Sequence, residues 1–377
     1  MRRLAIPGTI LACLATAALV AASAPAKPTT TDNNAALQKD VDALVAAGAP
    51  GAILLVRDGN RTLRVTGGLG NVAQKTPMRP NDHFKIASLT KSYTAALVLQ
   101  LVGEGKLGLG DSVERRLPGL VPNGNKITIR QLLNHTSGLA DFEANPRYLK
   151  PYLSGNFGYY WAPRELVKMG VSQKPLFAPG AGYSYSNTNY VLAQLIVEKV
   201  TGKSIGAELK RRIFQPLHLD DTTYPTKPGL PSPYAHGYKL LGKPPAVDVT
   251  GLSPSLAPGS GAIISTALDV ADFYRALLSG KLLKPKQMTA MKTVVSIRTG
   301  KAVASGAGDG LGISRPPFSC VGWSHGGEFP GYEVFAISSA DGRRQTVLMM
   351  NQDRSTAAKR AVALFDKLSE KAFCAGA

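Results

Sequence analysis

Hydrophobic positions near both ends of the chain repeat with the periods of helices and strands. Residues 35–48 place Leu37, Val41 and Leu44 at helical spacing. Two apolar runs follow, GAILLVR and TLRVTGG, and the turn-forming residues DGN between them predict a β-hairpin. Near the other end, YEVFAISS, ADG and QTVLMMN predict a second hairpin, with a helix after it over about 355–373.

The sequence between these hairpins is mostly helical or loop-like. The segments TIRQLLNHTSGL, APRELVKMG and YVLAQLIVEKVTG have helical patterns, and STALDVADFYRALLSGKLL predicts a helix capped by Ser265 or Thr266 and ended by Gly280. Strands at both chain ends, each with a helix outside it, predict an α+β fold. We expect one antiparallel sheet, built from both chain ends and flanked by helices, with a mostly helical subdomain inserted over roughly 107–258.

The N-terminal segment MRRLAIPGTILACLATAALVAASAPAKP has two arginines, an apolar run and then small residues, which is the pattern of a secretory signal. We expect a signal peptide over residues 1–26, a polar linker over 27–34 and a single domain over 35–377. A retained membrane anchor is the alternative, although small residues dilute the apolar run. The expected location is secreted, either extracellular or associated with the cell wall.

Removal of the signal leaves Cys320 and Cys374 as the only cysteines. An even pair in an exported chain predicts one disulfide, and two free buried thiols are the alternative. Such a bridge would close a loop of about 50 residues and stabilise the fold by about 4 kcal/mol in the chain-entropy model.

Charge and composition narrow the expected partners. Hydrophobic residues make up 44% and charged residues 18%, as in an ordinary folded protein, while the formal net charge is +19. The charge predicts anionic surroundings such as cell-wall polymers or a membrane surface. No basic run alternates with aromatic residues, so we expect no nucleic-acid partner.

The sequence has no His-rich or Cys-rich ligand spacing, so we expect no metal and no cofactor. We also expect a monomer.

The segment KIASLTKSYTAAL, residues 85–97, places Lys91 three residues after Ser88 at the start of an apolar helix. The two side chains then share one helical face, where the lysine could activate the serine as a nucleophile. The structural explanation is a lysine that lies along the helix flank with its charge in water. This pair alone leaves the choice open.

Two further segments carry side chains suited to catalysis. In YSYSNTNY, the Tyr185 phenol could shuttle a proton and the Asn187 amide could donate to a substrate carbonyl, although the segment also suits a helix-capping loop. In WSHGGEFPGY, Gly326 and Gly327 would let a substrate lie against an extended backbone, and His325 supplies a donor. A histidine beside glycines is also common in turns.

Together, Ser-x-x-Lys, Tyr-x-Asn and His-Gly-Gly, in this order, resemble the active-site triplet of the serine penicillin-recognising family. The tyrosine form of the second element is similar to class C β-lactamases, secreted D-Ala-D-Ala carboxypeptidases of actinomycetes and related esterases. Histidine in the third element is similar to the carboxypeptidase branch. The resemblance covers about 36–375, implies a β-lactamase/transpeptidase-like fold, and places both cysteines where that branch has its pair.

The resemblance implies roles for individual residues. Ser88 is the nucleophile, and the backbone N–H groups of Ser88 and Glu328 form the oxyanion hole. We expect Tyr185 to be the proton shuttle and Lys91 its electrostatic partner, with the reverse assignment open.

Two side chains bear on the choice of substrate. Arg315 is a candidate anchor for a substrate carboxylate, together with His325, which is charged only part of the time. Glu328 departs from the carboxypeptidase pattern, because its negative charge suits an amine better than a carboxylate.

We therefore expect a secreted serine hydrolase that forms an acyl-enzyme on a peptidoglycan peptide or another small acyl substrate. Release of the terminal D-alanine from peptidoglycan stem peptides is the first hypothesis. An esterase or β-lactamase that uses the same residues is the second, and a catalytically idle penicillin-binding module is the third.

Overall fold

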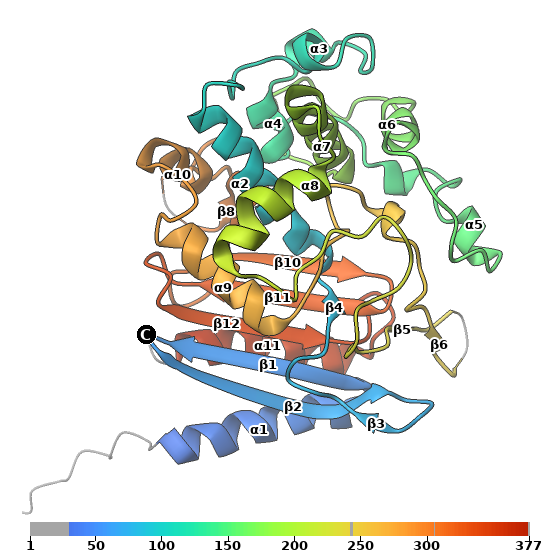
Figure 1. Cartoon of the computed structure of the whole chain (residues 1–377), viewed down its shortest axis with the longest axis vertical. Helices are drawn as coiled ribbons and strands as arrows, with labels where there is room; N and C mark the ends of the chain where they lie inside the picture. Colours follow the sequence, from blue (N-terminus) through green and yellow to red (C-terminus); the bar gives the residue numbers. More distant parts are fainter. Residues whose placement is uncertain (1–29, 242–243, 305, 376–377) are drawn as a thin grey trace, which may run out of the picture.

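The computed structural model describes residues 30–241, 244–304 and 306–375, and its centre is an antiparallel sheet. The eight strands of this sheet have the order β3-β2-β1-β12-β11-β10-β9-β8 (Figure 1). They are β1 (Gly51–Asp58), β2 (Arg61–Asn71), β3 (Thr76–Pro77), β8 (Gly308–Asp309), β9 (Ser314–Arg315), β10 (Trp323–Phe329), β11 (Tyr332–Ser338) and β12 (Arg344–Met350). Two small two-stranded sheets pair β4 (Phe84–Lys85) with β7 (Ile264–Ser265) and β5 (Tyr238–Lys239) with β6 (Val247–Asp248).

Helices surround this sheet and form the inserted subdomain. The α-helices are α1 (Thr30–Ala46), α2 (Thr90–Gly103), α3 (Val113–Arg116), α4 (Ile129–Leu133), α5 (Lys150–Leu153), α6 (Pro163–Val171), α7 (Asn187–Thr201), α8 (Ile205–Leu209), α9 (Ala267–Leu278), α10 (Pro285–Lys292) and α11 (Lys359–Cys374). Short 3-10 turns are η1 (Ala87–Leu89), η2 (Gly124–Lys126), η3 (Phe142–Ala144), η5 (Gln215–Leu217) and η6 (Pro254–Leu256), and η4 (Lys210–Phe214) is a π-helix.

The central strands come from opposite ends of the chain. β1 pairs with β12, with Leu54 opposite Leu348, and each strand also belongs to a hairpin at its own end of the chain. Both predicted hairpins are therefore confirmed, as is the α+β fold with an inserted helical subdomain. Within 107–258, the only strands in the described part are the short pair β5 and β6.

Alternate residues of the central strands face two separate cores, as the two-residue period of a strand requires. Leu54 of β1 packs with Val41 of α1 and Phe365 of α11 on one face. Ile53, its neighbour, belongs to the larger core on the opposite face, which also contains α2, α7 and α9. Figure 1 shows α1 and α11 on one side of the sheet and the helical subdomain on the other.

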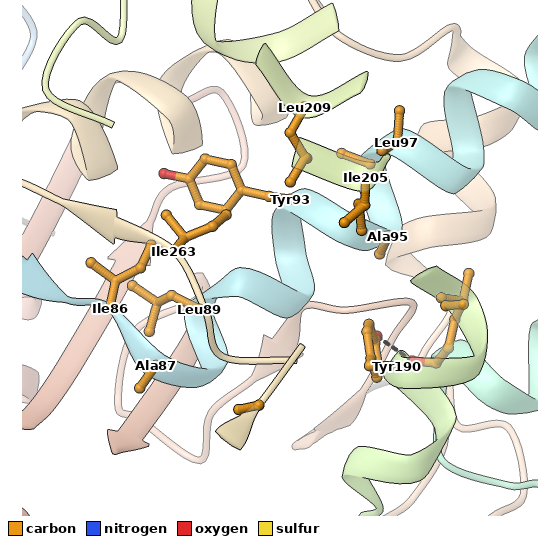
Figure 2. Packing of buried hydrophobic residues seen from close by; sticks show 14 of the residues in the cluster. Ile86, Ala87, Leu89, Tyr93, Ala95, Leu97, Tyr190, Ile205, Leu209 and Ile263 are labelled. Carbon is orange, nitrogen blue, oxygen red and sulfur yellow. Dashed lines mark hydrogen bonds between the residues drawn. The ribbon is translucent and has the colours of Figure 1, made fainter. Parts of the chain in front are cut away.

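Helix α2 is buried along nearly its whole length between the sheet and the subdomain. Residues Thr90 to Leu99 are all buried, which fits an apolar helix enclosed on every side. Figure 2 shows Tyr93 and Ala95 of α2 among side chains of α7 and α8, including Tyr190 and Ile205. The chemistry predicted for this segment therefore lies at the junction of two halves of the molecule.

Two predicted boundaries differ from the structure. Helix α1 begins at Thr30, so residues 30–34, which we expected in a polar linker, are helical. A helical turn needs only backbone hydrogen bonds, so a hydrophobic period does not show where a helix starts. Helix α11 begins at Lys359 rather than near Ser355, because the backbone N–H groups of Thr356 and Ala357 first form a turn onto the Asp353 carbonyl.

The predicted signal peptide, residues 1–26, lies outside the described residues. Within the described ranges, no helix is long and apolar enough to cross a membrane.

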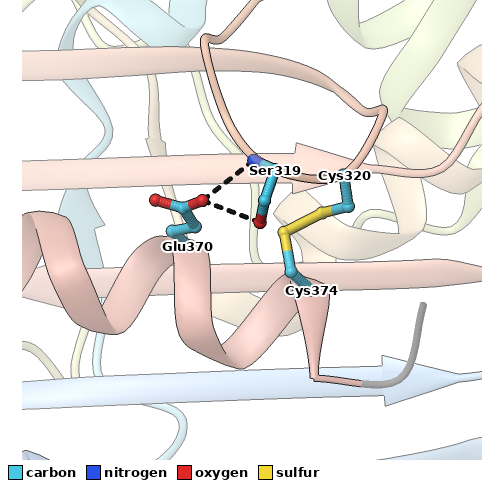
Figure 3. Close-up of a disulfide and its surroundings, with 4 residues drawn as sticks. All are labelled: Ser319, Cys320, Glu370 and Cys374. Atoms are coloured by element: carbon cyan, nitrogen blue, oxygen red, sulfur yellow. Dashed lines mark hydrogen bonds between the residues drawn. A yellow bond between two sulfur atoms is a disulfide. The ribbon is translucent and has the colours of Figure 1, made fainter.

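The predicted disulfide is present between Cys320 and Cys374, whose Cα atoms are 5.6 Å apart (Figure 3). It joins the end of α11 to the loop between β9 and β10. Beside it, the backbone N–H and the hydroxyl of Ser319 both donate to Glu370 Oε1 at 2.9 Å. The loop is therefore attached to α11 by a covalent bond and two hydrogen bonds.

Candidate active site

Ser88 lies in η1, directly before α2, and is held there by close backbone packing. Ala87 has a positive φ of 50°, which costs a non-glycine residue about 1–3 kcal/mol. Strand β10 passes so near that a Cβ atom on Gly327 would lie 2.7 Å from the Ile86 carbonyl oxygen and 3.0 Å from Ser88 N. Glycine at 327 is thus required for β10 to approach the nucleophile.

Lys91 is completely buried and its ammonium group points at Ser88. Its Nζ lies 3.0 Å from Ser88 Oγ, 2.6 Å from Asn187 Oδ1 and 3.1 Å from the Ser260 carbonyl oxygen. Burial lowers the pKa of Lys91 to about 7, although the charges of Asp141 and Glu143 act in the opposite direction. The structure therefore excludes the alternative of a solvated lysine on a helix flank.

Tyr185 forms the other side of this arrangement. Its ring centroid lies 4.8 Å from Lys91 Nζ, and 37% of the residue is exposed. Burial around the phenol raises the pKa of Tyr185, and its interaction with Ser88 lowers that pKa by less. The two pKa directions favour Lys91 as the group that takes the proton from Ser88, with Tyr185 as a protonated donor. This is the reverse of the assignment that we expected from the sequence.

His135 packs against the ring of Tyr185, and we predicted no role for it from the sequence. Its ring stacks on Tyr185 with centroids 4.3 Å apart, and its Nδ1 accepts a hydrogen bond from the Ser186 backbone N–H at 3.1 Å. Burial and the nearby Lys91 charge hold the pKa of His135 well below its usual range, so the ring is neutral. The motif LLNHTSGL contained this residue, but only the fold shows that it contacts Tyr185.

Asn187 connects Lys91 to a carboxylate. Its Oδ1 accepts from Lys91, while its backbone N–H and side-chain Nδ2 donate to Asp141 Oδ2 at 2.9 Å and 3.0 Å. The amide is therefore fixed in one orientation. One N–H of Nδ2 donates to Asp141, which leaves the other for the substrate carbonyl that we expected it to bind.

The third motif lies on β10, beside the nucleophile. His325 is buried, its Nδ1–H donates to the Gly326 carbonyl, and burial together with Lys91 lowers the pKa of His325 to about 4. At neutral pH this side chain is uncharged, whereas we expected a partial cation. His325, Gly326, Gly327 and Glu328 all line the same cleft as Ser88.

The two residues that bear on substrate choice occupy different surroundings. Glu328 lines the cleft, is exposed, and accepts a hydrogen bond from the Ser355 backbone N–H at 2.9 Å. Ser314 and Pro316 also line the cleft, but Arg315 between them does not. Because side chains alternate along a strand, Arg315 of β9 is directed elsewhere. The structure thus does not bring the proposed carboxylate anchor to the nucleophile.

The cleft has a volume of about 870 Å³ and a charge opposite to that of the whole chain. Five carboxylates line it: Asp141, Glu143, Glu328, Glu333 and Asp366. The cations among its described lining residues are Lys239, which pairs with Asp353 at 2.9 Å, and Arg354, which pairs with Glu333 at 3.0 Å and with Asp366.

Glu143 is a second carboxylate of the cleft whose charge acts on the reacting groups. It lies in η3 and lines the cleft. Its carboxylate accepts no hydrogen bond from any described residue. Although Glu143 is accessible inside the cleft, the surrounding protein and the Asp141 charge raise its pKa to about 7. Its charge also affects the pKa of Lys91 and of Tyr185. The sequence ADFEAN gave no signal for this role.

An apolar wall adjoins Glu143 and completes this part of the cleft. It consists of Tyr148, Leu149, Tyr152, Leu153, Phe157, Val249, Leu252 and Leu256. In the described part of the chain, no three His, Cys, Asp or Glu side chains are grouped so that they could hold a metal ion. The side chains present are suited to acyl transfer, which needs a nucleophile, a base and a proton donor.

These features define a serine hydrolase with a Ser–Lys–Tyr centre. The sequence pattern of the family described as Beta-lactamase matches residues 37–369, and the chain belongs to this family. The resemblance deduced from the three motifs is thereby confirmed at the level of the family.

Three relatives illustrate the range of the family. The chain is 37% identical to the D-stereospecific amidohydrolase from Streptomyces sp., with a TM-score of 0.81 over 91% of this chain and 99% of that one. It is 28% identical to the D-amino acid amidase from Ochrobactrum anthropi SV3 complexed with D-phenylalanine, with a TM-score of 0.81 over 92% and 100% of the two chains. It is 29% identical over 334 residues to penicillin-binding protein 4* of Bacillus subtilis (strain 168), covering 83% of this chain and 70% of that protein.

Proposed function

We propose that this serine hydrolase cleaves amides of D-amino acids that carry a free α-amino group. The observation that carries the proposal is Glu143, a carboxylate inside the cleft with no hydrogen-bond partner among the described residues. A substrate ammonium is the group that such a carboxylate would bind, and Glu328 adds a second negative charge nearby. The D configuration is taken from the relatives in Streptomyces sp. and Ochrobactrum anthropi.

The residues of the site support a two-step acyl transfer. Ser88 Oγ attacks the amide carbonyl while its proton passes to Lys91, and the backbone N–H groups of Ser88 and Glu328 stabilise the oxyanion. The C–N bond then breaks, and the leaving nitrogen takes a proton from Tyr185, which recovers one from Lys91. Water next attacks the ester on Ser88, which releases the amino acid and restores the serine hydroxyl.

Release of C-terminal D-alanine, our first hypothesis from the sequence, requires a cation for the terminal carboxylate. Among the described residues, Arg315 does not line the cleft, His325 is neutral, and Lys239 and Arg354 are already paired. The acidic lining would repel the carboxylate of such a peptide. The observations therefore favour the amidase over the carboxypeptidase.

A panel of four substrates tests the proposal: D-alanine amide, L-alanine amide, N-acetyl-D-alanine amide and an N-acylated D-Ala-D-Ala peptide. We expect Ser88-dependent release of ammonia from D-alanine amide with the highest kcat/KM of the four, and Ser88→Ala is the control. Faster Ser88-dependent release of D-alanine from the blocked peptide would overturn the proposal in favour of the carboxypeptidase.

We also propose that the protein is exported after loss of residues 1–26. The signal pattern in the sequence and the Cys320–Cys374 disulfide, which is typical of oxidising compartments, support this location. The intact mass of the protein recovered outside the producing cells tests it. A mass that includes residues 1–26 would contradict cleavage.

A further inference from the structure

We propose that the cleft contains a second binding region, the edge groove, which accepts an aromatic leaving group. The edge groove is defined by Pro316, Pro317, Phe318, Gly326 and Phe335, all of which line the same cavity as Ser88. The proposal rests on the proposed amidase function and extends it from the acyl part of the substrate to the amine that is released.

The free edge of β10 allows the cavity to continue past the nucleophile. Strand β9 pairs with β10 only between Ser314 and Ser324. Beyond Ser324, no described strand pairs with this edge, so 325–329 form the border of the sheet. The cleft can therefore extend from Ser88 across this border to Phe335 on the neighbouring strand, whose side chain lies on the opposite face of the sheet, against the core formed with α1 and α11.

Gly326 opens the floor of the edge groove, and the fold does not require glycine there. A Cβ atom on Gly326 would contact only Phe335 Cδ2, at an ordinary 3.9 Å, and its φ is not positive. Gly327, by contrast, is required by the approach of β10 to Ser88. The missing side chain at 326 instead leaves the Phe335 ring accessible from the cleft.

The walls of the edge groove are aromatic and held in place before any substrate binds. The rings of Phe318 and Phe335 lie 5.7 Å apart at 48°, a spacing suited to contact with a further ring. Directly after Phe318, Ser319 binds Glu370 and Cys320 forms the disulfide to α11 (Figure 3). Because the loop is fixed, little conformational entropy would be lost on binding.

The direction of the substrate along β10 assigns the edge groove to the leaving group. Glu328, near one end of the strand, is close enough to Glu143 to raise the pKa of that carboxyl group. Gly326 and His325 lie two and three residues toward the other end, about 7 Å and about 10 Å away along the strand. A substrate with its ammonium beside Glu143 and Glu328 would therefore direct its leaving amine toward the His325 end of β10, where the cleft crosses the border of the sheet to the edge groove.

The test compares D-alanine benzylamide with D-alanine methylamide. We expect wild-type protein to have the higher kcat/KM on the benzylamide, and we expect Phe318→Ala to lower the benzylamide-to-methylamide ratio about tenfold, as loss of one aromatic contact implies. Val321→Ala is the matched control, because Val321 belongs to the same loop, is 60% exposed and does not line the cleft. This control should keep the wild-type ratio.

An unchanged ratio in Phe318→Ala would overturn the edge groove and leave the amidase proposal intact. If neither amide is cleaved in a Ser88-dependent reaction, the amidase proposal fails instead. Binding then tests the groove separately, with D-alanine benzylamide observed by saturation-transfer NMR on Ser88→Ala. Strong saturation of the benzyl protons, lost in Ser88→Ala/Phe318→Ala, would support the groove, and equal saturation in both proteins would overturn it.

Discussion

Two buried lysines, Lys85 and Lys91, lie six positions apart and differ in their neighbours. Burial lowers the pKa of both to about 7. Lys85 donates to the Leu252 carbonyl at 2.6 Å and lies 4.7 Å from the Phe329 ring centroid, so its partners are a carbonyl and an aromatic ring. Lys91 instead contacts Ser88 Oγ. A lowered pKa thus identifies a base only where a nucleophile is within reach.

The largest difference between the two lysines should appear in catalysis. We expect Lys91→Met to lower kcat/KM on D-alanine amide about 1,000-fold or more, because the base for Ser88 is lost. Lys85→Met is the matched variant, and its loss should stay within about tenfold, since Lys85 only supports the cleft wall at Leu252. Steady-state kinetics on both variants, with folding checked by circular dichroism, makes the comparison. Equal losses would mean that Lys91 acts through structure rather than as the base.

The second difference is that two carboxylates, Asp141 and Glu143, act on the pKa of Lys91 but not on that of Lys85. We expect Glu143→Gln to lower kcat/KM on D-alanine amide about 100-fold, because the substrate ammonium loses its partner. A short-chain ester that has no amino group should be hydrolysed at nearly the wild-type rate. Comparison of the two substrates on this one variant provides the measurement. A similar loss on both would show that Glu143 does not bind an ammonium.

The pH dependence of ester hydrolysis should follow Lys91. The lysine is a base only when neutral, so kcat/KM on the ester should rise through about pH 7. The Glu143 charge raises the pKa of Lys91, so this rise should move to lower pH in Glu143→Gln. Lys85→Met should leave the profile unchanged. A profile without a rise near pH 7 would contradict the assignment of the base.

The smallest effect concerns stability, where both lysines should behave alike. Each has a folded-state pKa below its unfolded value near 10.4, so between about pH 7 and 10 the unfolded chain binds more protons. The free energy of unfolding should therefore rise with pH in that range, by at most about 1.4 kcal/mol per pH unit for each lysine. Urea unfolding of wild type and Lys85→Met at pH 7 and 9 should show a smaller rise in the variant. An identical rise in both proteins would contradict the lowered pKa of Lys85.

The sequence predicted the parts of the site that lie within short motifs. Spacing within the chain marked Ser88 with Lys91 and Tyr185 with Asn187, and alternation and turn residues marked the strands at both chain ends. These signals suffice to identify the residues because the two members of each pair lie close together in the chain, at the start of a single helix, α2 or α7.

The remaining features depend on contacts between distant segments. Glu143 lines the same cleft as Ser88 because η3 is held against α7 through Asp141 and Asn187. Arg315 does not line the cleft, as a carboxylate anchor would have to. Its side chain points away from the face used by its neighbours Ser314 and Pro316, because side chains alternate along a strand. The neutral state of His325 follows from burial, which no local pattern shows.

The pairing of β1 with β12 has a consequence for synthesis of the chain. The paired residues are about 300 positions apart, so the middle of the sheet is among the last contacts that a growing chain can form. Strand β10, which lies against Ser88, depends on β11 and β12 to join that sheet. A nascent chain that already contains Ser88, Lys91 and Tyr185 therefore has no assembled active site, and hydrolytic activity begins only when the final hairpin has been made.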